Sequence, residues 1–299
     1  MTTVLLLVSL ALGAWMVAVI EEWTTSGRFR LAAPLFAGIA LLGRESILAR
    51  KPDRLFFEVA PVLLLLSAVL AAAVIPLTPN LVVANLATGA LFVNAALVYV
   101  LVALLMAGWG PDGAYAMVGG WRFLGQLIGY AMLVVMPITA VVMRAESLFT
   151  TDIVMSQAEV WNIIYQPLGF VLFFIAAMAL AFLPPFDLPI AKGELAGGVE
   201  AEYSGVRLAV FRLGRLALII TLAAATVVFY LGGWQGPILP PWAWSALKIF
   251  GVTIIMLLSG RMMPRIREAH MLAWFWKLGI PLALLNIFIV GVLVLVLPS

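Results

Sequence analysis

The side chains best suited to chemistry gather in one polar stretch near the middle of the chain. The 21 positions from Asp187 to Arg207 hold four of the fourteen carboxylates and two basic residues, and the apolar runs 160–186 and 216–247 hold no charge. Four glycines and three prolines between 184 and 207 favour a shaped turn over a continuous helix. Such a turn could form an acidic pocket that meets a polar headgroup with titratable carboxylates. A solvated connecting loop is the alternative interpretation.

Three further polar residues lie inside or beside apolar runs. Arg122 and Gln126 are one helical turn apart, so they face the same side and either line a polar path or anchor a helix end. Lys248 lies about six residues into an apolar run, where it either snorkels to the membrane surface or belongs to a relay within the membrane. We predict no hydrolytic triad, phosphate-binding glycine loop or metal site: the chain has no Cys, and we expect its single histidine, His270, to be exposed.

The elements that must position these residues are transmembrane helices. Of the 299 residues, 65% are hydrophobic and 10% are charged, whereas about 25% are charged in a typical soluble domain. A span needs roughly 20 apolar residues. The uncharged runs, divided at Pro-rich and Gly-rich turns, predict about eight spans: residues 3–20, 59–75, 81–110, 123–143, 160–186, 216–231, 242–260 and 278–297. We therefore expect an all-α integral membrane protein, one domain over 1–299.

The basic residues predict how this bundle is oriented. Fifteen of the seventeen fall on one side of the predicted topology, and only Arg144 and Lys248 fall elsewhere. Cytoplasmic loops carry the excess of Lys and Arg, so that side is predicted to be cytoplasmic and both termini lie opposite. The fifteen are Arg28, Arg30, Arg44, Arg50, Lys51, Arg54, Arg122, Lys192, Arg207, Arg212, Arg215, Arg261, Arg265, Arg267 and Lys277.

The first span and the segment after it need separate interpretation. Residues 3–20 lack a basic start and a small-residue cleavage site, so a retained helix is favoured over a signal peptide. Residues 31–48 are apolar but contain Pro34, Arg44 and Glu45, which indicates a helix at the cytoplasmic interface.

Several motifs, in order, resemble one family. Pro185-Phe-Asp-Leu-Pro189, then Glu194-Leu195 and Glu202-Tyr-Ser-Gly205, closely resemble the loop of the H subunit of bacterial NADH–quinone oxidoreductase, respiratory complex I. Residues 151–162, Gly232-Gly-Trp-Gln-Gly-Pro-Ile-Leu-Pro-Pro241 with Lys248, and Pro264-Arg-Ile-Arg267 agree as well. The resemblance extends from about Phe36 to the C-terminus, and eight spans with an interfacial helix after the first is that family's layout.

The resemblance implies a role within a larger complex. The family's subunit joins the redox arm to the membrane arm and forms much of the tunnel that admits a quinone toward an iron–sulfur cluster on partner subunits. We accordingly expect a quinone as substrate, no catalytic residue in this chain alone, no nucleic-acid partner, and a place in the bacterial inner membrane. The pocket and coupling candidates are Asp187, Glu194, Glu202, Tyr203, Arg207, Arg122, Gln126 and Lys248.

The chain departs from the family pattern at several carboxylates. Ala131 stands where the family has a Glu after the Tyr, and Leu180 and Ile190 replace other acids. Arg215 stands where the family has the Glu of Gly-Glu-Tyr. The departures predict altered proton coupling, because a carboxylate relay cannot pass protons through apolar side chains without other groups or water.

Two other functions stay open. The chain could anchor a complex-I-related hydrogenase or another oxidoreductase that does not use quinone. Alternatively, it could be a structural adaptor with a closed quinone path.

Overall fold

The computed structural model describes residues 2–48 and 52–296, which are helical with short connecting segments. Arg50 and Lys51, two of the predicted cytoplasmic charges, lie outside the described residues. The long helices are α1 (Thr2–Ser26), α3 (Arg54–Val74), α4 (Gly89–Trp109), α5 (Ala114–Ala145), α9 (Gly205–Tyr230), α10 (Pro241–Met262) and α12 (Ile280–Val296). The shorter ones are α2 (Ala33–Leu42), α6 (Thr150–Met155), α7 (Asn162–Tyr165), α8 (Pro167–Leu180), η1 (Gly198–Glu200), α11 (Glu268–Trp274) and η2 (Phe275–Gly279).

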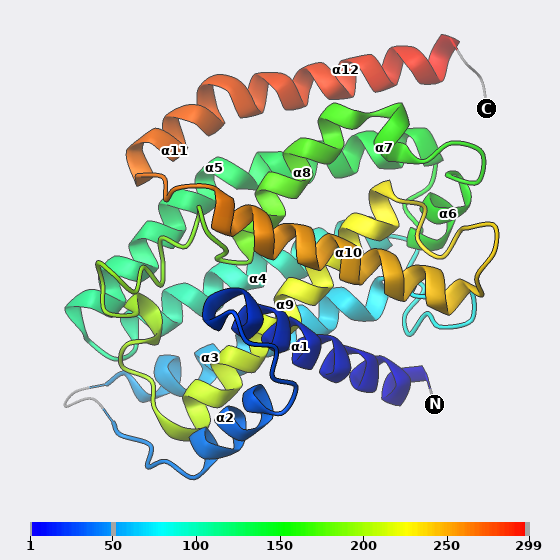
Figure 1. The fold of residues 1–299 in the computed structure, drawn as a ribbon. Helices are drawn as coiled ribbons and strands as arrows, with labels where there is room; N and C mark the ends of the chain where they lie inside the picture. Colours follow the sequence, from blue (N-terminus) through cyan, green and yellow to red (C-terminus); the bar gives the residue numbers. More distant parts are fainter. Residues whose placement is uncertain (1, 49–51, 297–299) are drawn as a thin grey trace.

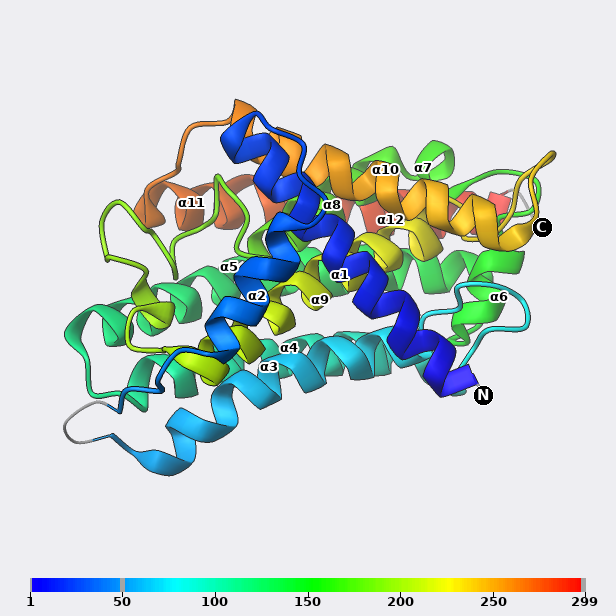
Figure 2. The ribbon, with the colours of Figure 1, turned by 60° about the horizontal axis from the view of Figure 1, so that its bottom comes forward.

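The helices form a bundle with two distinct ends. Both termini, α6 and the turn between α9 and α10 lie at one end, to the right in Figures 1 and 2. The α8–α9 loop and α11 lie at the opposite end. We name these the terminus end and the loop end. This arrangement places both chain ends on the same side, as the predicted topology requires.

Helix α9 forms the centre of the bundle. It contacts α1, α3 and α10 along its length, and nearly every residue from Ala217 to Tyr230 is buried. Small residues let other helices approach closely: a Cβ at Gly108 of α4 would lie 2.8 Å from the Ala116 carbonyl oxygen of α5. Close backbone contact of this kind is how membrane helices pack without a hydrophobic driving force between them.

Within the described residues, seven helical segments are long and apolar enough to cross a membrane. The expected span over 160–186 instead contains the 14-residue helix α8, about 21 Å long at 1.5 Å per residue. Pro167 opens α8, and Gln166 before it has φ −139° and ψ 69°, which are not helical. Because a bilayer core is about 30 Å thick, α8 alone is shorter than a full span.

The predicted helix over 31–48 is present but shorter. It runs from Ala33 to Leu42, ends before the two charged residues that follow, and packs against α1 and α9. At the other end of the chain, the expected span 278–297 corresponds to α12. This helix continues directly from α11 and η2, so the helical stretch starts about ten residues earlier than hydropathy alone predicts.

Candidate functional site

The loop between α8 and α9, residues 181–204, is folded tightly onto the loop end of the bundle. A Cβ at Gly198, which has φ +54°, would lie 1.9 Å from the Pro189 carbonyl oxygen, so only glycine fits where the loop crosses itself. Gly119 of α5 approaches the same carbonyl, since its Cβ would lie 2.5 Å away. The amide of Ile266 donates to the Pro185 carbonyl at 3.3 Å. The loop is therefore packed on α5 and on the segment after α10.

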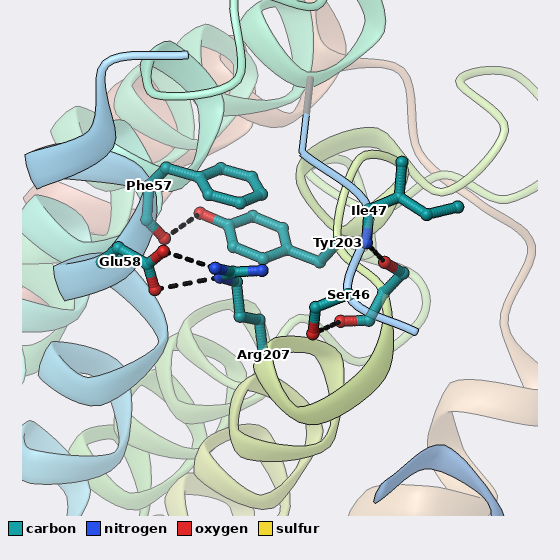
Figure 3. A network of polar contacts seen from close by, with 7 residues as sticks. Ser46, Ile47, Phe57, Glu58, Tyr203 and Arg207 are labelled. Carbon is teal, nitrogen blue, oxygen red and sulfur yellow. Dashed lines mark hydrogen bonds and ion pairs between the residues drawn. The ribbon is translucent and has the colours of Figure 1, made fainter. Parts of the chain in front are cut away.

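Where the loop enters α9, two side chains connect it to α3 (Figure 3). Arg207 donates two hydrogen bonds to Glu58: its Nε lies 2.9 Å from Glu58 Oε2, and its Nη2 donates to Oε1. The Tyr203 hydroxyl donates to the Phe57 carbonyl at 3.2 Å, and its ring stacks on Phe57 with centroids 4.5 Å apart. The Arg207 guanidinium also lies 5.4 Å from the centre of the Phe57 ring. Bidentate pairing and stacking are both arrangements that arginine makes and lysine does not.

The environment of Tyr203 keeps its hydroxyl protonated. Burial raises the pKa of this phenol well above its usual value, and the negative charge of Glu58 raises it further, while Arg207 opposes the shift. The side chain therefore remains a neutral hydrogen-bond donor to the Phe57 carbonyl throughout the physiological pH range.

The same corner also binds the segment after α2. The amide of Ile47 donates to Ser204 Oγ at 2.7 Å, and Ser46 Oγ lies 3.5 Å from the Ser204 carbonyl oxygen (Figure 3). Gly205 has φ +58°, and a Cβ there would lie 2.7 Å from the Arg44 carbonyl oxygen. The start of α9 thus holds both α3 and the segment that follows α2.

Deeper in the loop, two acids are nearly buried, and each faces an arginine. Asp187 pairs with Arg265, which comes from the segment between α10 and α11. Glu200 Oε2 lies 3.9 Å from Arg212 Nε, while its other oxygen is buried without a hydrogen-bond partner among the described atoms. A third pair joins α9 to α1, with Arg215 Nη2 3.1 Å from Glu21 Oε1.

Helix α5 carries the two polar residues predicted to share a face, and they bind different parts of the loop. Arg122 Nη1 bonds Glu194 Oε2 at 2.9 Å in an exposed pair. Gln126 is fully buried, and its Nε2 donates to the carbonyls of Ala179 at 2.8 Å and Phe186 at 3.1 Å. Gln126 therefore fixes the end of α8 and the start of the loop against α5.

Taken together, the loop end contains five carboxylate–arginine pairs within the described ranges. They connect α1, α3, α5, α9, the loop and the segment after α10. Chemically, this arrangement suits a rigid, charge-balanced surface better than a row of free proton carriers.

With this geometry in place, comparison with known proteins identifies the family. Residues 23–291 match the NADH dehydrogenase family. The chain belongs to this family, that of complex I subunit 1. The fold also resembles a chain in the structure of the membrane-bound sulfane sulfur reductase, an archaeal respiratory membrane complex, with a TM-score of 0.86 and 21% identity. The match covers 97% of this chain and 98% of that one.

The structure of this complex I subunit 1 family member brings together most of the candidate residues predicted from the sequence. Asp187, Glu194, Tyr203, Arg207, Arg122 and Gln126 all lie on or against the loop. Glu202 is exposed and lies beside Gly113, just before α5. Lys248 lies apart from them, because its partners are in the α9–α10 turn at the terminus end.

Sequence reasoning missed several members of this cluster at the loop end. Glu58, Glu21 and Arg265 were not candidates, and Glu200 was passed over although it is 8% exposed. Glu58 did carry a signal: it is a single carboxylate at the start of a long apolar run, where an acid is costly unless paired. The other pairings join residues far apart in sequence, so spacing gave no indication of them.

A hollow of about 360 Å³ lies on another face of the bundle. Apolar side chains of α3, α4 and α5 line it, among them Phe56, Trp109 and Trp121. A second, of about 520 Å³, lies between the ends of α5 and α12 at Met143 and Phe288. None of the candidate residues lines either hollow.

Proposed function

We propose that this chain is the membrane subunit that joins the redox arm of a complex-I-type oxidoreductase to its membrane arm and forms the membrane side of a quinone site. The folded loop 181–204 is the observation that carries the proposal. Ion pairs join it to α5, to α9 and to the segment after α10, so it presents a rigid polar surface at one end of an apolar bundle. A redox subunit needs such a surface to dock in a fixed register.

In this proposal the loop end is cytoplasmic and both termini lie outside. The clustering of Lys and Arg at this end supports the orientation, since basic residues concentrate in cytoplasmic loops. A bacterial inner membrane is the proposed location. The partners are iron–sulfur subunits on the cytoplasmic side, which bring the electrons that a chain without Cys cannot carry on such clusters, and neighbouring membrane-arm subunits.

The proposed subunit couples quinone chemistry to proton movement less directly than the family's carboxylate pattern implies. Arg215 occupies the position of a family Glu, and its guanidinium pairs with Glu21. Asp187, Glu58 and Glu194 are likewise held by arginines. Each of these carboxylates already binds an arginine, so they do not form an open row of groups along which a proton could pass.

A second function has one observation in its favour. The structural neighbour at TM-score 0.86 belongs to a sulfane sulfur reductase, so a closely similar fold serves a complex named for an acceptor other than quinone. In this alternative the chain keeps the same docking role and orientation, but its partner complex reduces a different acceptor.

Purification from native membranes tests the proposal. The tagged chain is isolated, its partners are identified by mass spectrometry, and the clusters of the complex are reduced with dithionite that is then removed. Electron paramagnetic resonance then monitors whether an added short-chain quinone reoxidises the clusters. Reoxidation that a quinone-site inhibitor blocks would support the quinone function. Reoxidation by polysulfide but not by quinone would favour the second function, and recovery without iron–sulfur partners would contradict both.

A further inference from the structure

Lys248 of α10 occupies a compact site at the terminus end, far from the loop. Its side chain is buried, with 8% of the residue exposed, although it lies inside a helix long and apolar enough to span a membrane. A buried ammonium is costly unless its charge and its donors are satisfied. None of the five ion pairs described above includes this residue, so something other than a carboxylate must stabilise it.

Three backbone carbonyls and two aromatic rings provide that stabilisation. Lys248 Nζ lies 2.6 Å from the carbonyl oxygen of Leu231, 3.1 Å from that of Gly233 and 2.7 Å from that of Gln235. It also lies 4.2 Å from the centre of the Trp161 ring, and 5.6 Å from the neighbouring ring of Trp244. A lysine ammonium has three N–H donors, so the three carbonyls use all of them.

The turn after α9 is shaped to direct these carbonyls to one point. Gly232 and Gly233 have φ of +68° and +51°, a conformation that favours glycine. Gly232 donates its amide at 3.0 Å to Gln157 Oε1, and Gln157 Nε2 donates to the Val228 carbonyl at 2.8 Å. The carbonyl end of a helix carries partial negative charge, which adds to the attraction for a cation.

We propose that the α9–α10 turn and Trp161 form a binding site for a primary ammonium cation, which the chain fills with its own Lys248. Oxygens of neutral carbonyls and the face of a tryptophan are the groups that recognise a small alkylammonium ion. Through these contacts the Lys248 ammonium holds α10 against the end of α9 and the segment before α7. This inference does not depend on the proposed function, because it concerns the opposite end of the bundle.

The geometry distinguishes this site from the two roles that the sequence left open for Lys248. A snorkelling lysine would place its nitrogen in the polar headgroup region rather than on buried carbonyls. A relay lysine would contact a group that exchanges protons, whereas the hydrogen-bond acceptors here are backbone carbonyls.

Removal of the side chain and chemical rescue test the site in the purified complex. For Lys248→Ala we expect a thermal midpoint about 5–10 °C below wild type, because three buried carbonyls lose their donors. Methylammonium chloride should raise this midpoint with increasing concentration, as a ligand of the native state does. Tetramethylammonium chloride has the same charge but no N–H donor, so it should have no such effect. Lys277→Ala, which removes an exposed lysine, is the matched control and should respond to neither salt.

Three results of that experiment would overturn the proposal. The first is a Lys248→Ala complex as stable as wild type. The second is a destabilised complex that neither salt restores, and the third is one that both salts restore equally.

A second measurement on the wild-type complex covers the case in which Lys248→Ala does not assemble. Reductive methylation of the native complex, followed by peptide mass spectrometry, should modify the exposed Lys277 and leave Lys248 unmodified until the protein is denatured. Modification of Lys248 in the native complex at the rate of Lys277 would show a free, solvent-facing amine and would overturn the proposal.

Discussion

Arg215 of α9 and Glu21 of α1 face each other at the loop end, with Nη2 of the arginine 3.1 Å from Oε1 of the glutamate. The arginine side chain is 14% exposed and the glutamate 34%, so the pair is largely removed from solvent. The sequence comparison predicts a family carboxylate where Arg215 stands; in this chain the arginine has an acidic partner from α1.

Loss of either partner should therefore weaken the join between α1 and α9. We expect Arg215→Ala to destabilise the complex by about 2 kcal/mol, less than the 3–5 kcal/mol typical of a fully buried pair because Glu21 is partly solvated. Exchange of the two residues, Glu21→Arg with Arg215→Glu, should recover part of the loss. Thermal unfolding of the purified complex measures both effects.

Arg212→Ala is the matched control for that experiment. Arg212 is on the same helix, is 48% exposed, and lies 3.9 Å from its acidic partner. Because the contact is long but Glu200 is buried, we expect a loss of about 1 kcal/mol, smaller than that for Arg215→Ala. An equal effect of Arg212→Ala and Arg215→Ala would contradict a special role for the α1–α9 pair.

The pair between Glu58 and Arg207 should show measurable coupling in a double-mutant cycle. The contact is bidentate but half exposed at Glu58, so we expect a coupling energy of about 0.5–1 kcal/mol. Arg207→Lys should lose most of this energy, because lysine cannot make the two parallel bonds or stack on Phe57. Denaturant unfolding of Glu58→Ala, Arg207→Ala and the double variant gives the number. A coupling near zero would mean that this ion pair does not help to join the start of α9 to α3.

Tyr203→Phe should separate the contribution of the hydroxyl group to stability from that of the aromatic ring. The stacked ring remains and the hydrogen bond to the Phe57 carbonyl is lost, so we expect a cost of about 1 kcal/mol. The folded-state pKa of Tyr203 lies above its unfolded value, so its contribution is fully present below about pH 10 and declines as the pH rises further. The stability difference between wild type and Tyr203→Phe should thus be constant from pH 6 to 9 and shrink above pH 10. A difference that already changes near pH 7 would contradict this account.

Gln126→Glu should be more damaging than its small size change suggests. The side-chain amide donates to two buried carbonyls, and a carboxylate would face the same carbonyls with acceptors. We expect a loss of at least about 2 kcal/mol, seen as a lower thermal midpoint and a lower yield of assembled complex. Gln126→Met keeps the length without the mismatch of charge and should cost less. An equal loss for the two variants would indicate that the missing donor, and not the charge of the carboxylate, sets the cost.

The ion pairing of the carboxylates also predicts that quinone reduction is only weakly coupled to proton movement. In proteoliposomes, the complex should move fewer protons per quinone reduced than a bacterial complex I assayed in the same vesicles. Acidification measured with a pH-sensitive dye gives the ratio. An equal stoichiometry would contradict the altered coupling predicted from the apolar residues Ala131, Leu180 and Ile190.

Hydropathy and charge alone predicted most of the fold, because long uncharged runs leave the chain few alternatives in a bilayer. The break at Gln166 was missed for the same reason: the apolar run continues through it, and only the following Pro167 gave a local signal. The last span was predicted to begin at residue 278, about ten residues too late. The charged residues at the start of α11 interrupt the apolar run, although they lie within the same continuous helical stretch.

The candidate site was predictable in location and less so in its contacts. The loop residues were recognisable because Gly, Pro and acids interrupt an apolar sequence. Their partners were not, because Glu58 and Arg207 are 149 positions apart and meet only when α3 packs beside α9. The sequence left Lys248 either at the membrane surface or in a relay and did not indicate the carbonyls that bind it. Those carbonyls converge only because Gly232 and Gly233 adopt positive φ angles. The orientation in the membrane and the quinone role stay predictions.

Photoaffinity labelling with an azido-quinone tests the central claim most directly, since it requires no knowledge of the electron donor. The purified complex is irradiated with the probe, and labelled peptides are sequenced by mass spectrometry. The account predicts label on this chain within or beside loop 181–204, reduced by excess unlabelled quinone. Labelling that excess quinone does not reduce, or that spares this chain altogether, would contradict a quinone site at the loop end.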